Sequence, residues 1–203
     1  MFNLEILIAL FIFAFVSSGT PGPNNIMLMA SGTNFGFKRS IPHILGINIG
    51  FSILTFSVGI GLMQIFDLFP RTHMILKILC SGYLIYLSYK IATSASNQKN
   101  EIKKSKPLTF LQAALFQWVN PKGWSMALSA ITIYSPSNDL LSVLIVTGAF
   151  SITNLPCQCA WAMLGQQFSR LLTNNFQLRV FNCIMAGLLL MTLVQIFIMS
   201  ETL

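Results

Sequence analysis

Two short segments rich in proline, glycine and asparagine carry the residue types in this chain best suited to binding a small polar molecule. They are Gly19-Thr20-Pro21-Gly22-Pro23-Asn24-Asn25 and Val119-Asn120-Pro121-Lys122-Gly123. Proline removes a backbone donor and clashes with the preceding helical turn, so neither segment fits inside an unbroken helix. Apolar sequence flanks both segments. In lipid, the freed amides and carbonyls of such a break must find partners or line a cavity.

Interrupted helices of this kind can bind an amino-acid zwitterion. The N-terminus of a half-helix holds a carboxylate through its free amides, and free carbonyls hold an ammonium group. We therefore expect a substrate site near mid-membrane with two walls, formed by Thr20, Pro21, Gly22, Pro23, Asn24 and Asn25 on one side and by Asn120, Pro121 and Lys122 on the other. The alternative for the first segment is a turn that follows a membrane span and lies in water.

Few ionisable side chains fall within apolar sequence, and each is a functional hypothesis by default because burying charge in a membrane is costly. They are Lys122, Lys77, His43 and His73. Lys122 either faces the substrate path or extends to the membrane surface, and we expect Lys77 to extend in that way. His43 is expected at the membrane interface.

Polar side chains of the later apolar stretches complete the candidate set. Asn154 precedes the backbone disturbance at Pro156 and joins the predicted site, whereas Gln117 and Gln158 favour hydrogen bonds between helices. No Asp or Glu lies deep in an apolar stretch. This pattern favours neutral substrates over lysine or arginine, because a cationic side chain would need a counter-charge.

The cysteines and histidines do not form a pattern expected of an enzyme or a metal site. Cys80, Cys157, Cys159 and Cys183 form no Cys-x-x-Cys, and two histidines are too few to complete a zinc set. We therefore expect no catalytic residues, no metal and no cofactor. A transmembrane thiol or electron carrier would need a cysteine beside each break, and it remains a weak alternative. A non-catalytic membrane scaffold is the other.

The composition predicts the elements that position these residues. Only 8% of the 203 residues are charged and 54% are hydrophobic, against about 25% charged in soluble domains. Four stretches without Asp, Glu, Lys or Arg reach the roughly 20 residues that cross a bilayer, namely Ile6–Phe37, Ser40–Phe66, Leu140–Ser169 and Val180–Ser200. Met74–Ala92 and Leu108–Tyr134 reach that length with lysines. The sequence thus predicts an all-α integral membrane protein of about six transmembrane helices.

The net charge of +7 is distributed over alternate loops. Basic residues follow the first, third and fifth predicted spans, at Lys38 and Arg39, at Lys90, Lys99, Lys103, Lys104 and Lys106, and at Arg170 and Arg179. The positive-inside rule places these loops in the cytoplasm and both termini in the periplasm of a bacterial inner membrane. A nucleic-acid surface would gather its basic residues on one face, so we expect no nucleic-acid partner. The first apolar stretch lacks the basic start of a signal peptide and is read as a mature span.

The polar loop Ser94–Lys106 divides the chain into two halves of three predicted spans each. We expect a first repeat at residues 1–93, a basic cytoplasmic linker at 94–107 and a second repeat at 108–203. Because three is odd, the repeats must be inverted in the membrane, as in many secondary transporters. Gly46 and Gly50 in the second span correspond in position to Gly148 in the fifth.

The sequence resembles the LysE/RhtB family of amino-acid exporters over nearly its whole length. The residues that carry the resemblance are Thr20-Pro21-Gly22-Pro23-Asn24-Asn25, Gly36-Phe37-Lys38, Gly46-Ile47-Asn48-Ile49-Gly50, Gly82-Tyr83-Leu84-Ile85-Tyr86-Leu87 and Asn120-Pro121-Lys122. Lys90-Ile91-Ala92-Thr93-Ser94 and Cys159-Ala160-Trp161-Ala162 make it most similar to the cysteine/O-acetylserine exporters. The resemblance implies proton-driven export of small amino acids or their metabolites from the cytoplasm, and it suggests a homodimer. Together with the absence of Asp and Glu deep in the apolar stretches, it predicts export of small neutral amino acids or derivatives, of the cysteine/O-acetylserine or threonine/homoserine kind.

Overall fold

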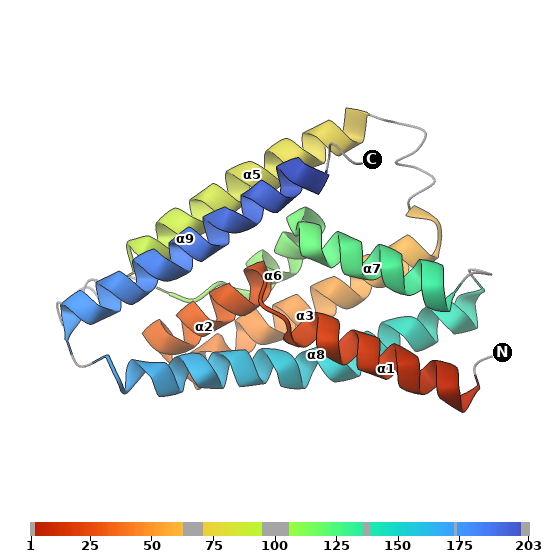
Figure 1. The fold of residues 1–203 in the computed structure, drawn as a ribbon, viewed down its shortest axis with the longest axis horizontal. Helices are drawn as coiled ribbons and strands as arrows, with labels where there is room; N and C mark the ends of the chain where they lie inside the picture. The colour runs from red at the N-terminus through yellow and green to blue at the C-terminus, as the bar shows by residue number, and fades with distance from the viewer. Residues whose placement is uncertain (1–2, 63–70, 95–105, 136–138, 173, 200–203) are drawn as a thin grey trace.

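The computed structural model describes residues 3–62, 71–94, 106–135, 139–172 and 174–199, and every element within these ranges is a helix (Figure 1). In chain order the helices are α1 Leu4–Gly19, α2 Pro23–Phe35, α3 Phe37–Gly59, α5 Arg71–Ala92, α6 Phe110–Phe116, the 3₁₀ turn η1 Gln117–Val119, α7 Pro121–Tyr134, α8 Leu140–Ser169 and α9 Asn175–Met199. The all-helical fold is therefore confirmed. The linker residues Lys99, Lys103 and Lys104 lie outside the described residues, as do the side chains of His73, Lys77 and Cys80.

Three of the described helices, α3, α8 and α9, are long and apolar enough to cross a membrane, and the pair α1 and α2 makes a fourth candidate span. The described residues thus give three or four candidate spans by length and composition. The predicted fourth span is interrupted at Asn120, between η1 and α7, so neither part has the length of a span. The six-span count stays a prediction.

The break between α1 and α2 bends the first apolar stretch without reversing it. The two helices meet at an angle of 55° across a short interruption, and the chain runs on toward the opposite end of the molecule (Figure 1). α2 starts with Pro23, whose fixed φ and missing N–H suit the first helical position. The first segment is therefore an interruption within one long stretch rather than a hairpin turn.

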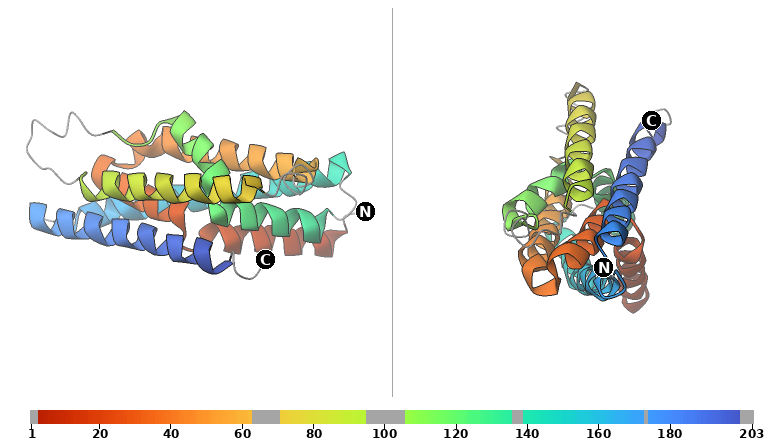
Figure 2. Two further views of the ribbon diagram at one scale, coloured as in Figure 1. Left: turned by 90° about the horizontal axis from the view of Figure 1, so that it is seen from above. Right: turned by 90° about the vertical axis from the view of Figure 1, so that its left-hand side faces the viewer.

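Helix α8 packs along α1, α2 and α3, while α3 also packs against α6 and α7. α5 pairs with α9, and the two lie side by side along one flank (Figures 1 and 2). Glycines permit the closest crossings, because a methyl group added at Gly165 of α8 would overlap the Met29 carbonyl of α2. Gly46 and Gly50 of α3 contact α6 in the same way.

The predicted correspondence of Gly148 with Gly46 and Gly50 does not extend to packing. No atom lies within 4 Å of a methyl group built on Gly148. Gly165, near the other end of the same helix, makes the close contact instead. Sequence position alone could not distinguish the two, because packing depends on which face of α8 meets α2.

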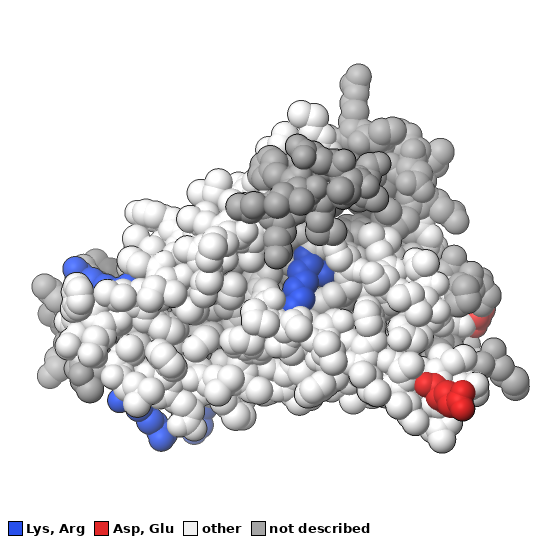
Figure 3. All heavy atoms as spheres, in the orientation of Figure 1, with Lys and Arg blue, Asp and Glu red and all other residues white. Residues whose placement is uncertain are grey.

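Charged side chains gather at the two ends of the molecule. Figure 3 shows basic groups at one end, acidic groups at the other and one further basic group near the middle. The basic end includes Lys38 and Arg39, which open α3, and the acidic end includes Glu5 of α1 and Asp139 at the start of α8. Between the ends, large apolar side chains such as Ile12 on the outer helix faces are exposed. This distribution fits a protein that crosses a membrane.

Candidate functional site

The carbonyl groups that α1 leaves free at its C-terminus are held by side chains from elsewhere in the fold. Asn25 donates from Nδ2 to the Ser18 carbonyl (2.8 Å) and to the Thr20 carbonyl (2.7 Å). The indole N–H of Trp161 in α8 donates to the Gly19 carbonyl (3.2 Å). These bonds stabilise the break, because unpaired backbone groups are costly where water is excluded.

Lys122 crosses from the second break to the first. Its ammonium group donates to the Thr20 carbonyl at 2.7 Å, to the Thr20 hydroxyl at 2.8 Å and to the Pro21 carbonyl at 3.4 Å. Lys122 is itself in the first turn of α7, where the helix dipole disfavours a positive charge. The negative C-terminal end of α1 offers the better environment. Of the two alternatives for Lys122, this conformation fits the one in which the side chain faces the break rather than the membrane surface.

A reciprocal pair of amides ties the same two breaks together. Asn24 Nδ2 donates to Gln117 Oε1 at 2.8 Å, and Gln117 Nε2 donates to Asn24 Oδ1 at 3.1 Å. Asn120 Nδ2 adds a longer bond to Gln117 Oε1 at 3.4 Å. Gln117 is fully buried. Its predicted role as an interhelical hydrogen-bond partner holds, and it fixes the position of Asn24.

The two breaks line one pocket, which we call the central cavity. Its lining residues are Ser17, Ser18, Gly22, Asn24, Asn25, Phe51, Asn120, Lys122, Gly123, Met126 and Asn154. Polar groups come from the breaks and from α8, and apolar walls come from Phe51 and Met126. No Asp or Glu is among these lining residues. The cavity therefore suits a small molecule with polar ends and an uncharged side chain.

Two helix N-termini meet at the central cavity without side-chain caps. α2 begins after Gly22 and α7 begins after Asn120, and neither N-cap residue supplies a capping hydrogen bond. Uncapped amides and the positive dipole end attract a carboxylate. Two buried lining atoms, Ser18 Oγ and Asn120 Oδ1, have no hydrogen-bond partner among the described residues. Unpartnered buried polar atoms are typical of places where a ligand or water binds.

The structure brings most of the predicted site residues together. Gly22, Asn24, Asn25, Asn120, Lys122 and Asn154 line the central cavity. Thr20 and Pro21 contribute carbonyls that hold Lys122. Pro23 and Pro121 start α2 and α7 and are not among the lining residues. The sequence reasoning missed the serine pair Ser17 and Ser18 and the capping role of Trp161. The serines directly precede the predicted segment, so a wider window would have included them.

One sequence expectation is corrected near this site. His43 is 1% exposed and fully enclosed by the helices, not at the membrane interface. α3 begins at Phe37, so His43 lies more than one turn inside it, and the helix is covered there by neighbouring segments.

Alternative chemistries find little support among the described residues. Cys157, Cys159 and Cys183 are free thiols, and none of the three lines the central cavity. Within the described part of the chain, no group of three His, Cys, Asp or Glu could hold a metal ion.

Apolar helices that are interrupted around an internal polar cavity are the architecture of a membrane transporter. Residues 15–201 match the model of the LysE type translocators, so the chain belongs to this family. It is therefore a membrane transporter rather than an enzyme, and a multi-pass inner-membrane protein. The resemblance noted in the sequence is confirmed.

Curated relatives carry a more specific description. Proteins described as cysteine/O-acetylserine efflux proteins in Escherichia coli (strain K12), Shigella flexneri serotype 5b (strain 8401) and Shigella sonnei (strain Ss046) are each 30% identical to the chain over 196 residues. The matches cover 95% of this chain and 97% of each relative. They support amino-acid export. No solved structure gives a significant match.

Proposed function

We propose that this protein exports small neutral amino acids or their derivatives, of the cysteine/O-acetylserine or threonine/homoserine kind, and binds them in the central cavity. The observation that carries this proposal is the meeting of both helix breaks at one cavity, with Lys122 held by the carbonyls at the end of α1. The efflux proteins at 30% identity support the same substrate class.

The ammonium group of Lys122 stands where the ammonium group of a substrate would bind. Thr20 and Pro21 offer it two carbonyls and a hydroxyl. The ammonium group of a substrate replaces Lys122 as the donor to these acceptors. The substrate carboxylate then accepts hydrogen bonds from the displaced Lys122 and from the uncapped amides of α2 and α7. In the absence of substrate, Lys122 keeps the acceptors satisfied. The lysine thus exchanges partners with each bound molecule.

The transport cycle we propose is alternating access between two inverted three-helix repeats, at residues 1–93 and 108–203, joined by the cytoplasmic linker 94–107. In this arrangement α1 of the first repeat corresponds to α6 of the second, and α3 corresponds to α8. The contacts support this correspondence, because α8 packs on α1 as α3 packs on α6. Two buried apolar clusters flank the central cavity. One includes Leu54 and Phe150, and the other includes Met27 and Phe116. Each cluster would part in turn to open the cavity to one side.

The orientation that we propose places the basic end in the cytoplasm and both termini in the periplasm. Lys38 and Arg39 share that end with Arg170 and Arg179, at the junction of α8 and α9, and lipid covers the apolar helix faces between the ends. We also propose a homodimer and coupling to protons, both on the strength of the family resemblance.

Efflux from cells preloaded with labelled cysteine, O-acetylserine, threonine, homoserine or lysine tests the proposal. Protein-dependent loss of a neutral amino acid, abolished by a protonophore and absent for lysine, is the expected result. Asn25→Ala should slow that loss in protein that is shown to be inserted. Efflux of lysine alone, or of none of the five compounds from cells that carry inserted protein, would contradict the proposal.

A further inference from the structure

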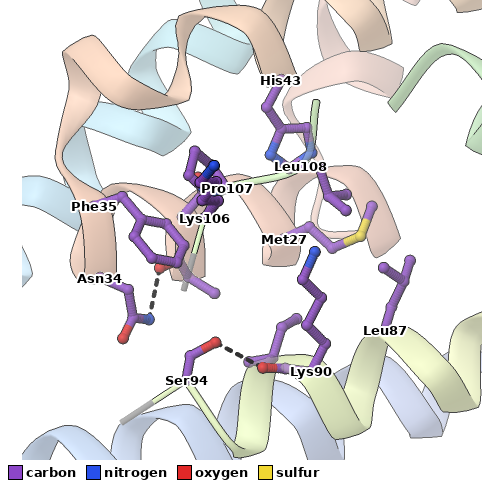
Figure 4. Close-up of a pocket in the computed structure, with 13 residues that line it drawn as sticks. Met27, Asn34, Phe35, His43, Leu87, Lys90, Ser94, Lys106, Pro107 and Leu108 are labelled. Atoms are coloured by element: carbon purple, nitrogen blue, oxygen red, sulfur yellow. Dashed lines mark hydrogen bonds between the residues drawn. The ribbon is translucent and has the colours of Figure 1, made fainter. Parts of the chain in front are cut away.

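A second cavity, which we call the basic cavity, lies between α2, α3 and α5 (Figure 4). Met27, Ser31 and Asn34 of α2 form one wall, and Leu87 and Lys90 of α5 face them. His43 and Lys106 complete its polar lining, and Ser94 lies at its edge. It adjoins the C-terminal end of α5, which lies at the same end of the molecule as the turn between α2 and α3 (Figure 1).

His43 reaches the basic cavity with its hydrogen-bonding groups unused. Its side chain is 1% exposed, and neither ring nitrogen has a hydrogen-bond partner among the described residues. Figure 4 shows the ring directed into the cavity from α3. A buried imidazole without partners is costly, so this position is suited to a ligand that the ring can contact.

Two lysines give the basic cavity its positive charge. Lys90 extends from α5 across the cavity toward His43, and Lys106 enters from the segment before α6 (Figure 4). No Asp or Glu is among the lining residues, and neither ammonium group has an ion pair within the described part of the chain. An anion would satisfy both lysines and the histidine together.

The remaining polar groups of the wall already have partners. Asn34 exchanges two hydrogen bonds with Asn182 of α9, at 2.8 and 3.0 Å, and also donates to the Ala30 carbonyl. The Ser94 hydroxyl donates to the Lys90 carbonyl at 2.6 Å. The groups left for a ligand are therefore His43, Lys90 and Lys106.

Helix α2 lines both the basic cavity and the central cavity. Asn24 lines the central cavity and Met27 lines the basic cavity, and residues three apart share one face of a helix. Met27 belongs to a buried apolar cluster with Leu87, Leu108 and Phe116. Phe116 directly precedes Gln117, which is bonded to Asn24. The apolar cluster thus separates the two cavities by about one helical turn.

We propose that the basic cavity is a second binding site, at which His43, Lys90 and Lys106 hold the carboxylate of an amino acid before it enters the central cavity. The inference rests on the proposed function, since the ligand is the same substrate on the cytoplasmic side. Transfer between the sites requires the Met27–Phe116 cluster to part. The basic cavity binds the carboxylate alone, and the central cavity then binds both the ammonium group and the carboxylate of the zwitterion.

Histidine-selective ¹⁵N NMR of the purified protein provides the test, because the chain contains only two histidines. The His43→Gln variant assigns the signals. Titration with reduced cysteine should shift the His43 ring signals saturably, in wild type and in the Lys122→Met variant. Lys90→Gln and Lys106→Gln should each weaken that response about ten- to hundredfold, as expected for loss of a charged hydrogen bond. Lys38→Gln is the matched control, and Lys90→Arg should retain the response if Lys90→Gln does not fold.

Separate titrations identify the ligand. Cysteamine, which lacks the carboxylate, should leave the His43 signals unchanged. A His43 response to inorganic phosphate or to an anionic phospholipid, with none to cysteine, would overturn the proposal in favour of a phosphate site. Unshifted signals in a protein that exports cysteine would overturn this inference alone. A saturable shift in a protein that exports none of the tested amino acids would overturn the proposed function and leave the site standing.

Discussion

Replacing Lys122 by methionine should weaken the preference of the central cavity for an amino acid over the corresponding amine. In the wild type, the Lys122 ammonium occupies the Thr20 carbonyl and hydroxyl at 2.7 and 2.8 Å. An incoming ammonium group must displace it. Cysteine compensates for this displacement because its carboxylate pairs with the displaced lysine, whereas cysteamine has no carboxylate with which the lysine could pair.

The size of the effect follows from these contacts. A hydrogen bond to a charged group contributes about 1.5–3 kcal/mol, and each 1.4 kcal/mol is roughly a factor of ten in affinity. Without the competing lysine, cysteamine should bind about ten- to hundredfold more tightly to Lys122→Met. Cysteine also binds the Thr20 acceptors without competition in this variant, but its carboxylate no longer has Lys122 as a partner. These two effects oppose each other, so the dissociation constant of cysteine should change much less. The preference for cysteine, expressed as the ratio of the two constants, should therefore shrink.

Equilibrium binding of cysteine and cysteamine to purified protein under reducing conditions measures both constants. Lys38→Met, which removes an exposed lysine of the basic end, is the matched control and should leave both unchanged. The reasoning is refuted if cysteamine binds Lys122→Met no more tightly than it binds the wild type.

Three further predictions follow from the packing and from the helix breaks. Gly165→Ala forces a methyl group into the backbone of α2 and should destabilise the detergent-purified protein by about 1–3 kcal/mol. The control Gly148→Ala, in the same helix, places its methyl group where no atom lies nearby and should leave the melting temperature unchanged or raise it. Equal melting temperatures for the two variants would contradict the packing of α8 on α2. Asn25→Ala removes two bonds to backbone carbonyls and should cost about 1–3 kcal/mol of stability, so an unchanged thermal transition would exclude this role. Pro21→Ala and Pro23→Ala should reduce efflux in membrane-inserted protein, and wild-type efflux from both would remove the functional role of the break.

Many of the residues that line the central cavity could be predicted from the sequence, because their signals are local. Proline dictates where a helix must break, and the asparagines beside the breaks supply the groups that secure them. Asn154 was found by the same rule, through its neighbour Pro156. Trp161 could not be assigned its role, since the bond to the Gly19 carbonyl depends on how α8 crosses α1.

The basic cavity could not be predicted, because its groups come from three separate segments. His43, Lys90 and Lys106 are far apart in the sequence and meet only when α5 and the segment before α6 pack beside α2 and α3. Taken alone, His43 near the start of an apolar stretch resembles an interfacial residue. The packing that buries it is a tertiary effect.

The distance between the carboxyl carbon of bound cysteine and Lys122 Nζ tests the central claim most directly. Solid-state NMR dipolar recoupling between [1-¹³C]cysteine and ¹⁵Nζ-lysine protein measures it, and the Lys122→Met variant identifies the signal. The account predicts a coupling of direct-contact strength that disappears in Lys122→Met. Saturable binding without any coupling that depends on Lys122 would show that the substrate carboxylate lies elsewhere, and it would contradict the exchange of partners proposed for the central cavity.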